Sequence, residues 1–433
     1  MIYFGTDGIR GIVGEDITQE ICFRCGNAVS KLKPKAKIII ARDTRTSGSF
    51  VLSSFVSGAT MGGANVIDVG ILPTPAISFL VQELKADFGV MITASHNSAE
   101  YNGIKIFDST GKKINSKLEN QIERNFAKNY IDKSKKYGRY IVKTKLYKNY
   151  LNHLTNCANT NLNGLKVVLD CSNGASYLIA SKVFKKLGAS VTKINASNNG
   201  EKINYQCGAL YPQKLAETVK KLKADVGFAF DGDADRITVV DENGKTVDGD
   251  QIMLFLVDMY KRYNLLKSHA VVGTVQTNMA VERYLKENGI TLLRTDVGDK
   301  YVTEELFKKN LQIGGEQSGH IIISEYTKTG DGILCALMIG KFIVASGEKL
   351  SKNIFYDLFK QHLKNYVVND KYAVINSAST KIAINECEQL LNGNGRVVVR
   401  ASGTEPKVRV MVETQDKNIA KKIFDKLDKA IGA

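Results

Sequence analysis

Four short apolar runs, each ending in a polar turn, constrain the fold of this chain more than any other feature. They are Lys37–Ala41, Lys166–Leu169, Ala270–Gly273 and Arg396–Val399, and stretches with helical periodicity such as Leu215–Leu222 lie between them. Strands that alternate with helices predict βαβ units with largely parallel sheets. Because the runs are spaced roughly a hundred residues apart, each is expected to belong to its own domain.

Length and composition exclude several classes of protein. A chain of 433 residues with 43% hydrophobic and 24% charged residues can form about two to four globular domains with cores that need no disulfides. Disorder is therefore excluded as the main state. No apolar run approaches the roughly 18 residues of a membrane span. The N-terminus lacks a basic segment followed by an apolar one, so we expect no signal peptide and a cytoplasmic protein.

Polar stretches mark the expected domain boundaries. Residues 156–163 are rich in Asn, Asp241–Lys245 has the composition of a turn, and residues 366–371 precede the last strand–helix unit. That unit ends in a helical pattern from Asn418 to Ile431. The expected domains are residues 1–155, 156–245, 246–365 and 366–433.

The charge balance favours an anionic partner. Lys and Arg number 60 against 44 Asp and Glu, a net charge of +16, which suits nucleic acid, a membrane surface or phosphorylated small molecules. The densest basic stretch, Lys133–Lys148, carries tyrosines that could stack on single-stranded nucleic acid. A solvated connector with an edge strand is the preferred interpretation, because isolated charge runs are common.

The seven cysteines indicate neither disulfides nor a zinc site. Their number is odd and their spacing scattered. Cys22 and Cys25 form a lone CxxC between apolar residues, with no second pair to complete a metal site. We predict that both pack in the core from one face of a helix.

The first motif with chemical potential is Thr93-Ala-Ser-His-Asn97, which follows the apolar run Phe88–Ile92. A serine at the end of a strand is exposed to ligands and to nearby backbone N–H groups. Ser95 is either a nucleophile or a helix cap, and from these five residues alone the cap is favoured. Lys105 follows soon after and supplies a nearby cation.

The second motif is Asp231-Gly-Asp-Ala-Asp-Arg236, directly after the apolar run Val226–Phe230. Three carboxylates at alternate positions repel one another unless a hard cation such as Mg²⁺ or Ca²⁺ neutralises them. An EF-hand loop is rejected, because Arg236 stands where that loop needs glycine and Ile237–Val240 looks like a strand. A solvated acidic turn is the remaining alternative.

Three further loops complete the set. Gly314–His320 combines glycines with Glu, Ser and His, which can bind sugar hydroxyls, although a plain loop is equally compatible. Arg400–Arg409 places two arginines around a Ser-Gly-Thr turn, which suits a phosphate, with a structural hairpin as the alternative. Gly5–Gly11 is a glycine-rich loop with an arginine. Together the motifs indicate phosphoryl transfer on a phosphosugar.

These five motifs, in this order along the whole chain, resemble the α-D-phosphohexomutase family. Phe4–Gly11 and Gly314–His320 are most similar to the branch that acts on glucosamine phosphates, whereas relatives acting on mannose and glucose phosphates more often have Met at the position of Gln317. Asp296–Val302 resembles a further loop of the family's third domain. The resemblance implies an α/β fold of four domains around a central cleft, three α/β domains with mixed or parallel sheets and a smaller C-terminal α+β domain.

The resemblance also implies an activity, an isomerase-class phosphotransfer between glucosamine 6-phosphate and glucosamine 1-phosphate through a 1,6-bisphosphate, in the synthesis of an amino-sugar nucleotide precursor. Action on mannose or glucose phosphates is the alternative, and nucleic-acid binding a distant one. The implied cofactors are Mg²⁺, a covalent phosphate on Ser95 and the hexose 1,6-bisphosphate. The implied partner is a small phosphosugar, with no nucleic acid and no membrane, and a homodimer is left open.

Residue roles follow from the same resemblance. Ser95 carries the phosphoryl group, and the metal lies between it and Asp231, Asp233 and Asp235. The remaining catalytic candidates are Arg10, His96, Lys105 and Arg236. The expected sugar and phosphate ligands are Glu316, Ser318, His320, Arg400, Ser402, Gly403, Thr404 and Arg409.

The chain departs from the family pattern at two loop positions. Ser98 and Ala401 stand where the family commonly has proline. Proline fixes φ, so both changes alter loop stiffness without removing a functional group. Ala234, where the family often has glycine, is a common variant.

Overall fold

The computed structural model describes residues 4–5, 7–126, 134, 136–354, 357–402 and 406–432. The chain divides into two compact units. The first comprises Met1–Val272 with Gly298–Phe355, and the second comprises Gly273–Val297 with Tyr356–Ala433.

The first unit begins with a mixed six-stranded sheet in the order β1-β5-β4-β2-β3-β6. β2 is parallel to both β3 and β4, and β3 is parallel to β6. β5 is antiparallel to both β4 and β1. The strands are β1 (Ile9–Ile12), β2 (Lys37–Arg42), β3 (Asn65–Ile71), β4 (Phe88–Ile92), β5 (Tyr101–Asp108) and β6 (Tyr140–Val142).

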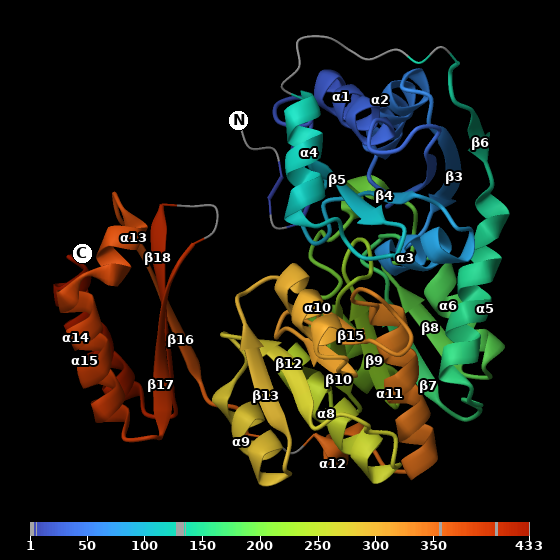
Figure 1. The fold of residues 1–433 in the computed structure, drawn as a ribbon. Helices are drawn as coiled ribbons and strands as arrows, with labels where there is room; N and C mark the ends of the chain where they lie inside the picture. Colours follow the sequence, from blue (N-terminus) through green and yellow to red (C-terminus); the bar gives the residue numbers. More distant parts are fainter. Residues whose placement is uncertain are drawn as a thin grey trace. The chain divides into compact units, whose positions relative to one another are not determined.

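Helices cover both faces of this sheet (Figure 1). Phe88 and Val90 of β4 belong to the core under α1 (Gln19–Ser30), α2 (Gly48–Met61) and α4 (Ser116–Phe126). Gly89, on the opposite face of the same strand, lies against Ile77 and Val81 of α3 (Thr74–Glu83). This alternation is the reason that β4, although buried throughout, serves two helical layers.

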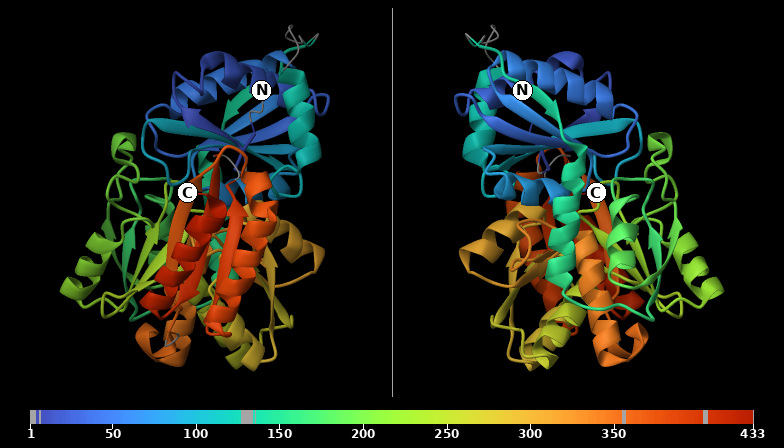
Figure 2. Two further views of the ribbon diagram at one scale, coloured as in Figure 1. Left: turned by 90° about the vertical axis from the view of Figure 1, so that its left-hand side faces the viewer. Right: turned by 90° about the vertical axis from the view of Figure 1, so that its right-hand side faces the viewer.

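The basic stretch is a connector with an edge strand, as predicted. β6 forms the edge of the sheet, and its three residues are exposed. The stretch then continues into a 3₁₀ turn, Thr144–Leu146, and into α5 (Tyr147–Ala158). Lys133 and Lys135 lie outside the described residues. Helix α5 leads from the first sheet to the second (Figure 2, right).

The second sheet has the order β11-β10-β9-β7-β8. β7 is parallel to β8 and β9, and the antiparallel strands β10 and β11 extend it. Leu215 and Val219 anchor α7 on this sheet, and Ile237 begins β10, in agreement with the rejection of an EF-hand. The elements are β7 (Lys166–Asp170), α6 (Ile179–Lys186), β8 (Ser190–Ile194), a 3₁₀ turn (Gly200–Lys202), α7 (Gln213–Leu222), β9 (Val226–Phe230), β10 (Ile237–Asp241) and β11 (Thr246–Val247).

The remainder of the first unit surrounds a third sheet, in which β12 pairs with β14 in parallel and β14 with β15 in an antiparallel hairpin. Its first helix begins with a capping box between Asp248 and Gln251. The elements are α8 (Gly249–Arg262), β12 (Ala270–Thr274), α10 (Asp299–Lys308), β14 (Ile313–Gly315), β15 (Ile321–Ile323), α11 (Gly332–Ser346) and α12 (Leu350–Asn353).

The second unit contains an antiparallel sheet in the order β16-β18-β17. The expectation of a parallel sheet is therefore wrong for the run Arg396–Val399, because β17 returns directly as β18 without a crossover helix. Helices α14 and α15 pack on this sheet (Figure 1). The elements are α9 (Met279–Glu287), β13 (Thr291–Thr295), β16 (Gln361–Val367), α13 (Lys371–Asn376), α14 (Ala378–Leu391), β17 (Gly395–Ala401), β18 (Lys407–Thr414) and α15 (Lys417–Ile431).

The other local predictions are confirmed. β2, β7, β12 and β17 contain the four apolar runs, and α15 contains the C-terminal helical pattern. Cys22 and Cys25 are fully buried on α1. Among the described residues, no helix combines the length and hydropathy needed to cross a membrane.

Candidate active site

Ser95 lies at the carboxyl end of β4, in a loop that leads directly to β5. No helix begins at this serine, so the interpretation of Ser95 as a helix cap is wrong. Its side chain is fully buried, and its Oγ donates a hydrogen bond to Asp231 Oδ2 at 2.7 Å. Its backbone φ is +51°, in the left-handed region that residues other than glycine rarely adopt. The hydroxyl is therefore held against the acidic loop by an unusual backbone conformation.

The three aspartates of that loop converge immediately after β9. Asp231, Asp233 and Asp235 are buried, and carboxylate oxygens from all three lie within 4.8 Å of one another. Burial, together with the charges of Asp235 and Asp233, raises the pKa of Asp231 well above its ordinary value. Asp233 Oδ1 and Asp235 Oδ1 are buried and accept no hydrogen bond from the residues that the structure describes. Oxygen ligands of this kind fit a hard divalent cation such as Mg²⁺.

Lys105, on β5, contacts the same cluster. Its Nζ lies 2.9 Å from Asp233 Oδ2, 3.0 Å from Asp235 Oδ2 and 3.1 Å from Asp7 Oδ2. Burial opposes the charged form, but Asp233, Asp235 and Asp7 raise the pKa of Lys105 well above its ordinary value. Lys105 is consequently an ammonium at neutral pH, paired with two aspartates of the loop whose Asp231 contacts Ser95.

His96 and Arg10 come together beside Ser95. His96 Nδ1 is 3.4 Å from Ser95 Oγ, and Arg10 donates to the side chain of Asn97 at 3.2 Å. Burial, and then the charges of Arg236 and Arg10, lower the pKa of His96 to about 3. The imidazole is therefore neutral at pH 7 and can accept a proton.

Arg236 closes the acidic loop. Its backbone N–H donates to Asp231 Oδ1 at 3.2 Å. Burial disfavours its charge, yet Asp235 and Asp231 raise the pKa of the guanidinium. Ala234, between the aspartates, has a φ of +56°, which explains why glycine suits this position.

The Gly314–His320 motif forms the β14–β15 hairpin, and its three polar residues differ in position. His320 is buried and accepts a hydrogen bond at Nε2 from the Gly330 N–H at 2.9 Å. Its Nδ1, which then carries the proton, lies 3.9 Å from Asp235 Oδ1. Glu316 is also buried, which raises its pKa, whereas Ser318 is exposed. The structure thus places His320 beside the acidic cluster and leaves Ser318 accessible.

A partly buried charge network next to this cluster was not predicted from the sequence. Lys113 forms ion pairs with both Asp7 and Asp299, and Asp299 Oδ2 lies 3.8 Å from His320 Nε2. Asp7 and Asp299 stand in loops that the sequence singled out, without a role for either residue. Lys113 follows an ordinary turn, and no pattern in the sequence distinguishes it from the other lysines.

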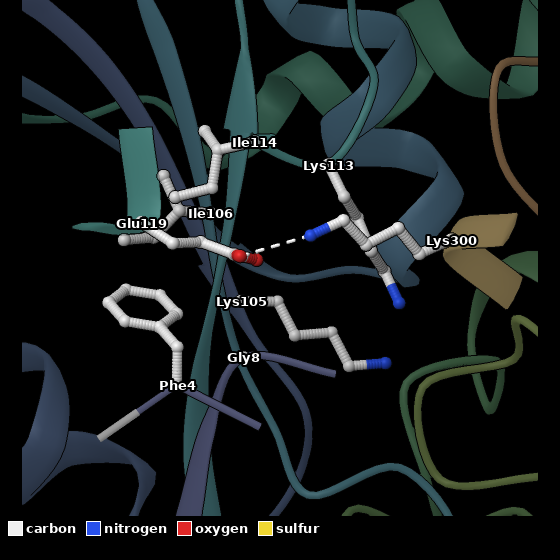
Figure 3. Close-up of a pocket in the computed structure, with 8 residues that line it drawn as sticks. All are labelled: Phe4, Gly8, Lys105, Ile106, Lys113, Ile114, Glu119 and Lys300. Carbon is white, nitrogen blue, oxygen red and sulfur yellow. Dashed lines mark hydrogen bonds and ion pairs between the residues drawn. The ribbon is translucent and has the colours of Figure 1, made fainter. Parts of the chain in front are cut away.

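A small cavity adjoins this network (Figure 3). The side chains of Lys113 and Lys300 lie on one side of it. Lys300 forms an ion pair with Glu119, with 3.0 Å between Nζ and Oε2. Phe4, Ile106 and Ile114 form the apolar side. Lys105 lines the same cavity as Lys113 and Lys300. These three lysines therefore extend to the carboxylates beside Ser95, because Lys105 pairs with Asp233.

The arginines of the last motif lie in the second unit. Arg400 on β17 and Arg409 on β18 are directly opposite each other in the antiparallel ladder, an arrangement that like charges disfavour. Burial, followed by the charge of Arg409, lowers the pKa of Arg400. Both line a cavity of about 120 Å³ together with Gln276 and Asn365. An anion would relieve the repulsion between these two guanidinium groups.

The rest of this motif is only partly described. The side chain of Ser402 is buried, and its carbonyl accepts a hydrogen bond from Lys371 Nζ at 2.6 Å. Gly403 and Thr404, which were predicted to bind the same phosphate, lie outside the described residues.

Comparisons with known proteins agree with this arrangement. Models of the phosphoglucomutase/phosphomannomutase family match four consecutive segments of the chain. The alpha/beta/alpha domains I, II and III match residues 1–132, 148–244 and 248–362, and the C-terminal domain matches residues 363–430.

Relatives of known name are similar over nearly the whole chain. Phosphoglucosamine mutase of Clostridioides difficile (strain 630) is 40% identical, over 98% of this chain and 97% of that protein. Phosphoglucosamine mutase of Thermoanaerobacter sp. (strain X514) is 44% identical, over 95% of both chains.

Solved structures show the same fold. A phosphoglucomutase/phosphomannomutase family protein from Burkholderia thailandensis has a TM-score of 0.85 at 22% identity, covering 99% of this chain and 96% of that one. N-acetylphosphoglucosamine mutase of Aspergillus fumigatus, in complex with GlcNAc-6P and magnesium, has a TM-score of 0.71 at 18% identity, covering 100% and 95%. With four family models that span it from residue 1 to residue 430 and relatives above 40% identity, this chain belongs to the phosphoglucomutase/phosphomannomutase family, the α-D-phosphohexomutases.

Proposed function

We propose that this chain interconverts glucosamine 6-phosphate and glucosamine 1-phosphate, with Ser95 as the phosphoryl carrier and a 1,6-bisphosphate as the intermediate. One observation carries the proposal, namely the buried Ser95 hydroxyl 2.7 Å from a cluster of three carboxylates. The names of relatives at 40–44% identity support glucosamine phosphate as the substrate.

Asp231, Asp233 and Asp235 would hold Mg²⁺, together with an oxygen of the phosphate on Ser95. Asp233 Oδ1 and Asp235 Oδ1 are buried and accept no hydrogen bond from the described residues, which supports this role. When bound, the ion supplies positive charge that offsets the negative charge of the phosphoryl group. Arg10 and Arg236 add positive charge from the protein itself.

In each half-reaction the bond between Ser95 Oγ and phosphorus breaks as a bond between phosphorus and a sugar oxygen forms, or the reverse. The attacking sugar hydroxyl loses a proton, which a protein base must accept. His96 is a candidate for this base by position, with Nδ1 3.4 Å from Ser95 Oγ, but its lowered pKa makes it a weak base. Lys105 is held protonated by its three aspartates, so its role is to stabilise charge or to donate a proton.

The two ends of the substrate require different groups. Glu316 and Ser318 would bind sugar hydroxyls, with His320 beside them, because a carboxylate accepts hydrogen bonds from hydroxyls and a serine hydroxyl both donates and accepts them. Arg400, Ser402, Gly403, Thr404 and Arg409 would hold the phosphate that does not react. The opposed pair Arg400 and Arg409 supports this assignment.

A coupled assay with the 6-phosphates of glucosamine, glucose and mannose, side by side, tests the proposed substrate. We expect the highest kcat/KM with glucosamine 6-phosphate and a requirement for Mg²⁺. A higher kcat/KM with glucose or mannose 6-phosphate would reject glucosamine phosphate and favour phosphoglucomutase or phosphomannomutase activity, the activities in the family's name.

A further inference from the structure

Arg45, in the loop after β2, is a completely buried charged side chain that the proposed mechanism does not use. Its guanidinium donates hydrogen bonds to main-chain carbonyls between Ser95 and the first residue of β5, and to one carboxylate. The acceptors are the carbonyls of Ser95 (3.1 Å), Asn97 (2.7 Å), Ser98 and Tyr101 (2.9 Å), and the carboxylate of Asp43 (3.0 Å).

Asp43 connects Arg45 to the other side of the same loop. One of its oxygens accepts the Arg45 backbone N–H at 3.0 Å, and the other accepts the Thr93 hydroxyl at 2.7 Å. The Thr93 oxygen in turn accepts the backbone N–H of Ser95 at 2.9 Å. The N–H of Ser95 is thus fixed through Thr93 and Asp43, and its carbonyl through Arg45.

A second tether comes from the loop after β8. Asn204 donates from Nδ2 to the carbonyls of Ser95 and Asn97, both at 2.8 Å. The N–H of Ser95, whose φ is +51°, donates to Thr93, and its carbonyl accepts from both Arg45 and Asn204. Such a conformation persists only where the surrounding structure determines it. Arg45 also donates to the carbonyls of Asn97, Ser98 and Tyr101, so it contacts more carbonyls of residues 95–101 than Asn204 does.

We infer that Arg45 is a positioning residue, which holds the main chain of residues 95–101 so that Ser95 Oγ faces Asp231. This inference rests on the proposed function, because it concerns the geometry of the phosphoryl carrier. Arg45 is paired with Asp43, and both side chains are completely buried. We therefore infer that Arg45 affects the reaction through the loop that it holds. A planar guanidinium is suited to this role, because it donates in several fixed directions at once.

The first test is Arg45→Met, which keeps the length of the side chain and removes the donors. A displacement of about 1 Å in a reacting group can cost about 100-fold in rate, so we expect kcat to fall about 100-fold while KM stays unchanged. Arg45→Lys should recover part of the lost kcat, because one ammonium cannot reach all the carbonyls. The control is Tyr150→Phe, which removes a buried hydrogen bond, to Asp331, outside the serine loop.

Arg45→Met leaves the carboxylate of Asp43 buried without its partner, which can prevent folding. The double variant Asp43→Asn/Arg45→Met removes both charges and should recover Tm. Its kcat should stay about 100-fold low, since the carbonyls of the loop remain without their donor. Wild-type kcat in the folded double variant overturns the inference.

Hydrogen–deuterium exchange distinguishes this inference from the proposed function, because it needs no substrate. In the double variant we expect faster exchange at the amides of residues 94–102 and unchanged exchange there in Tyr150→Phe. Equal exchange in the double variant and the wild type overturns the inference. If the wild type fails to turn over any hexose phosphate, the proposed function is rejected, and the exchange at this loop decides the role of Arg45.

Discussion

Ser95 Oγ and Asp231 Oδ2 lie 2.7 Å apart although 136 positions separate the two residues in the chain. Ser95 lies in the loop after β4 of the first sheet, and Asp231 lies in the loop after β9 of the second. The hydrogen bond therefore joins the proposed phosphoryl carrier to the proposed metal ligands across two sheets.

Ser95→Ala should abolish turnover and leave the fold intact. Alanine has no oxygen to carry a phosphoryl group, and Ala234 shows that an alanine in this chain can adopt a φ near that of Ser95. Intact-mass analysis after incubation with glucose 1,6-bisphosphate should show one added phosphate on the wild type and none on the variant. Ser98→Ala, in the same loop, is the control and should keep both the turnover and the added phosphate. Wild-type-like turnover by Ser95→Ala would contradict the role of Ser95 as the phosphoryl carrier.

Asp233→Asn should weaken the response to Mg²⁺ and lower activity together. One of its carboxylate oxygens accepts a hydrogen bond from the Lys105 ammonium, and the other accepts none from the described residues. The substitution therefore removes one charged ligand from three. A titration of activity against Mg²⁺ should show half-saturation at a higher concentration. Asp258→Asn, on α8, where the carboxylate pairs with Arg262, should respond as the wild type does. Undiminished activity of Asp233→Asn in excess chelator would contradict a metal role.

Arg400→Ala should weaken substrate binding and release the bisphosphate before the second half-reaction. Losing a charge-assisted hydrogen bond to phosphate costs about 1.5–3 kcal/mol, roughly a 10- to 150-fold loss of affinity. Arg400→Lys should recover only part of the lost affinity, because lysine lacks the planar guanidinium fork. Added glucose 1,6-bisphosphate should restore some turnover to Arg400→Ala.

The control for this prediction is Lys364→Ala, on the neighbouring strand β16, where the lysine pairs with Asp428 outside the cavity. It should leave KM unchanged. If Arg400→Ala also shows an unchanged KM and no response to the bisphosphate, Arg400 is a structural residue of the β17–β18 hairpin.

Asp331 should make stability depend on pH. Burial raises its pKa from 3.8 to about 6, although the Leu334 N–H and the Tyr150 hydroxyl donate to it. Because the folded protein binds this proton more tightly than the unfolded chain, the stabilising contribution is complete below about pH 4 and is lost as the pH rises through about 6. Asp331→Asn cannot ionise and still caps α11.

The difference in unfolding free energy between Asp331→Asn and the wild type should therefore shift by about 2.4 kcal/mol in favour of the variant between about pH 4 and pH 7. Urea unfolding at these two values measures the shift. Parallel pH dependence of the two proteins would show that Asp331 does not titrate in this range.

The expected domain boundaries after residues 155, 245 and 365 stay predictions, as does the cytoplasmic location.

The sequence by itself determined the local structure and the composition of the site. Apolar runs that end in polar turns identify β4 and β9, and Ser95 and Asp231 follow these strands directly. Strand formation depends on residues that are adjacent in the chain, so their pattern can be interpreted locally. The motif order identified the family for the same reason, since each motif is a contiguous segment.

Only the tertiary structure decided which charges meet. Lys105 contacts Asp7 in one loop and Asp233 and Asp235 in another, and Lys113 differs from the exposed lysines only in where β5 and its turn place it. Arg45 looks in the sequence like part of an ordinary polar turn, and the helix-cap interpretation of Ser95 was wrong because the chain returns as β5. Such contacts depend on how distant strands are paired and packed, and a pattern of neighbouring residues carries no information about that pairing.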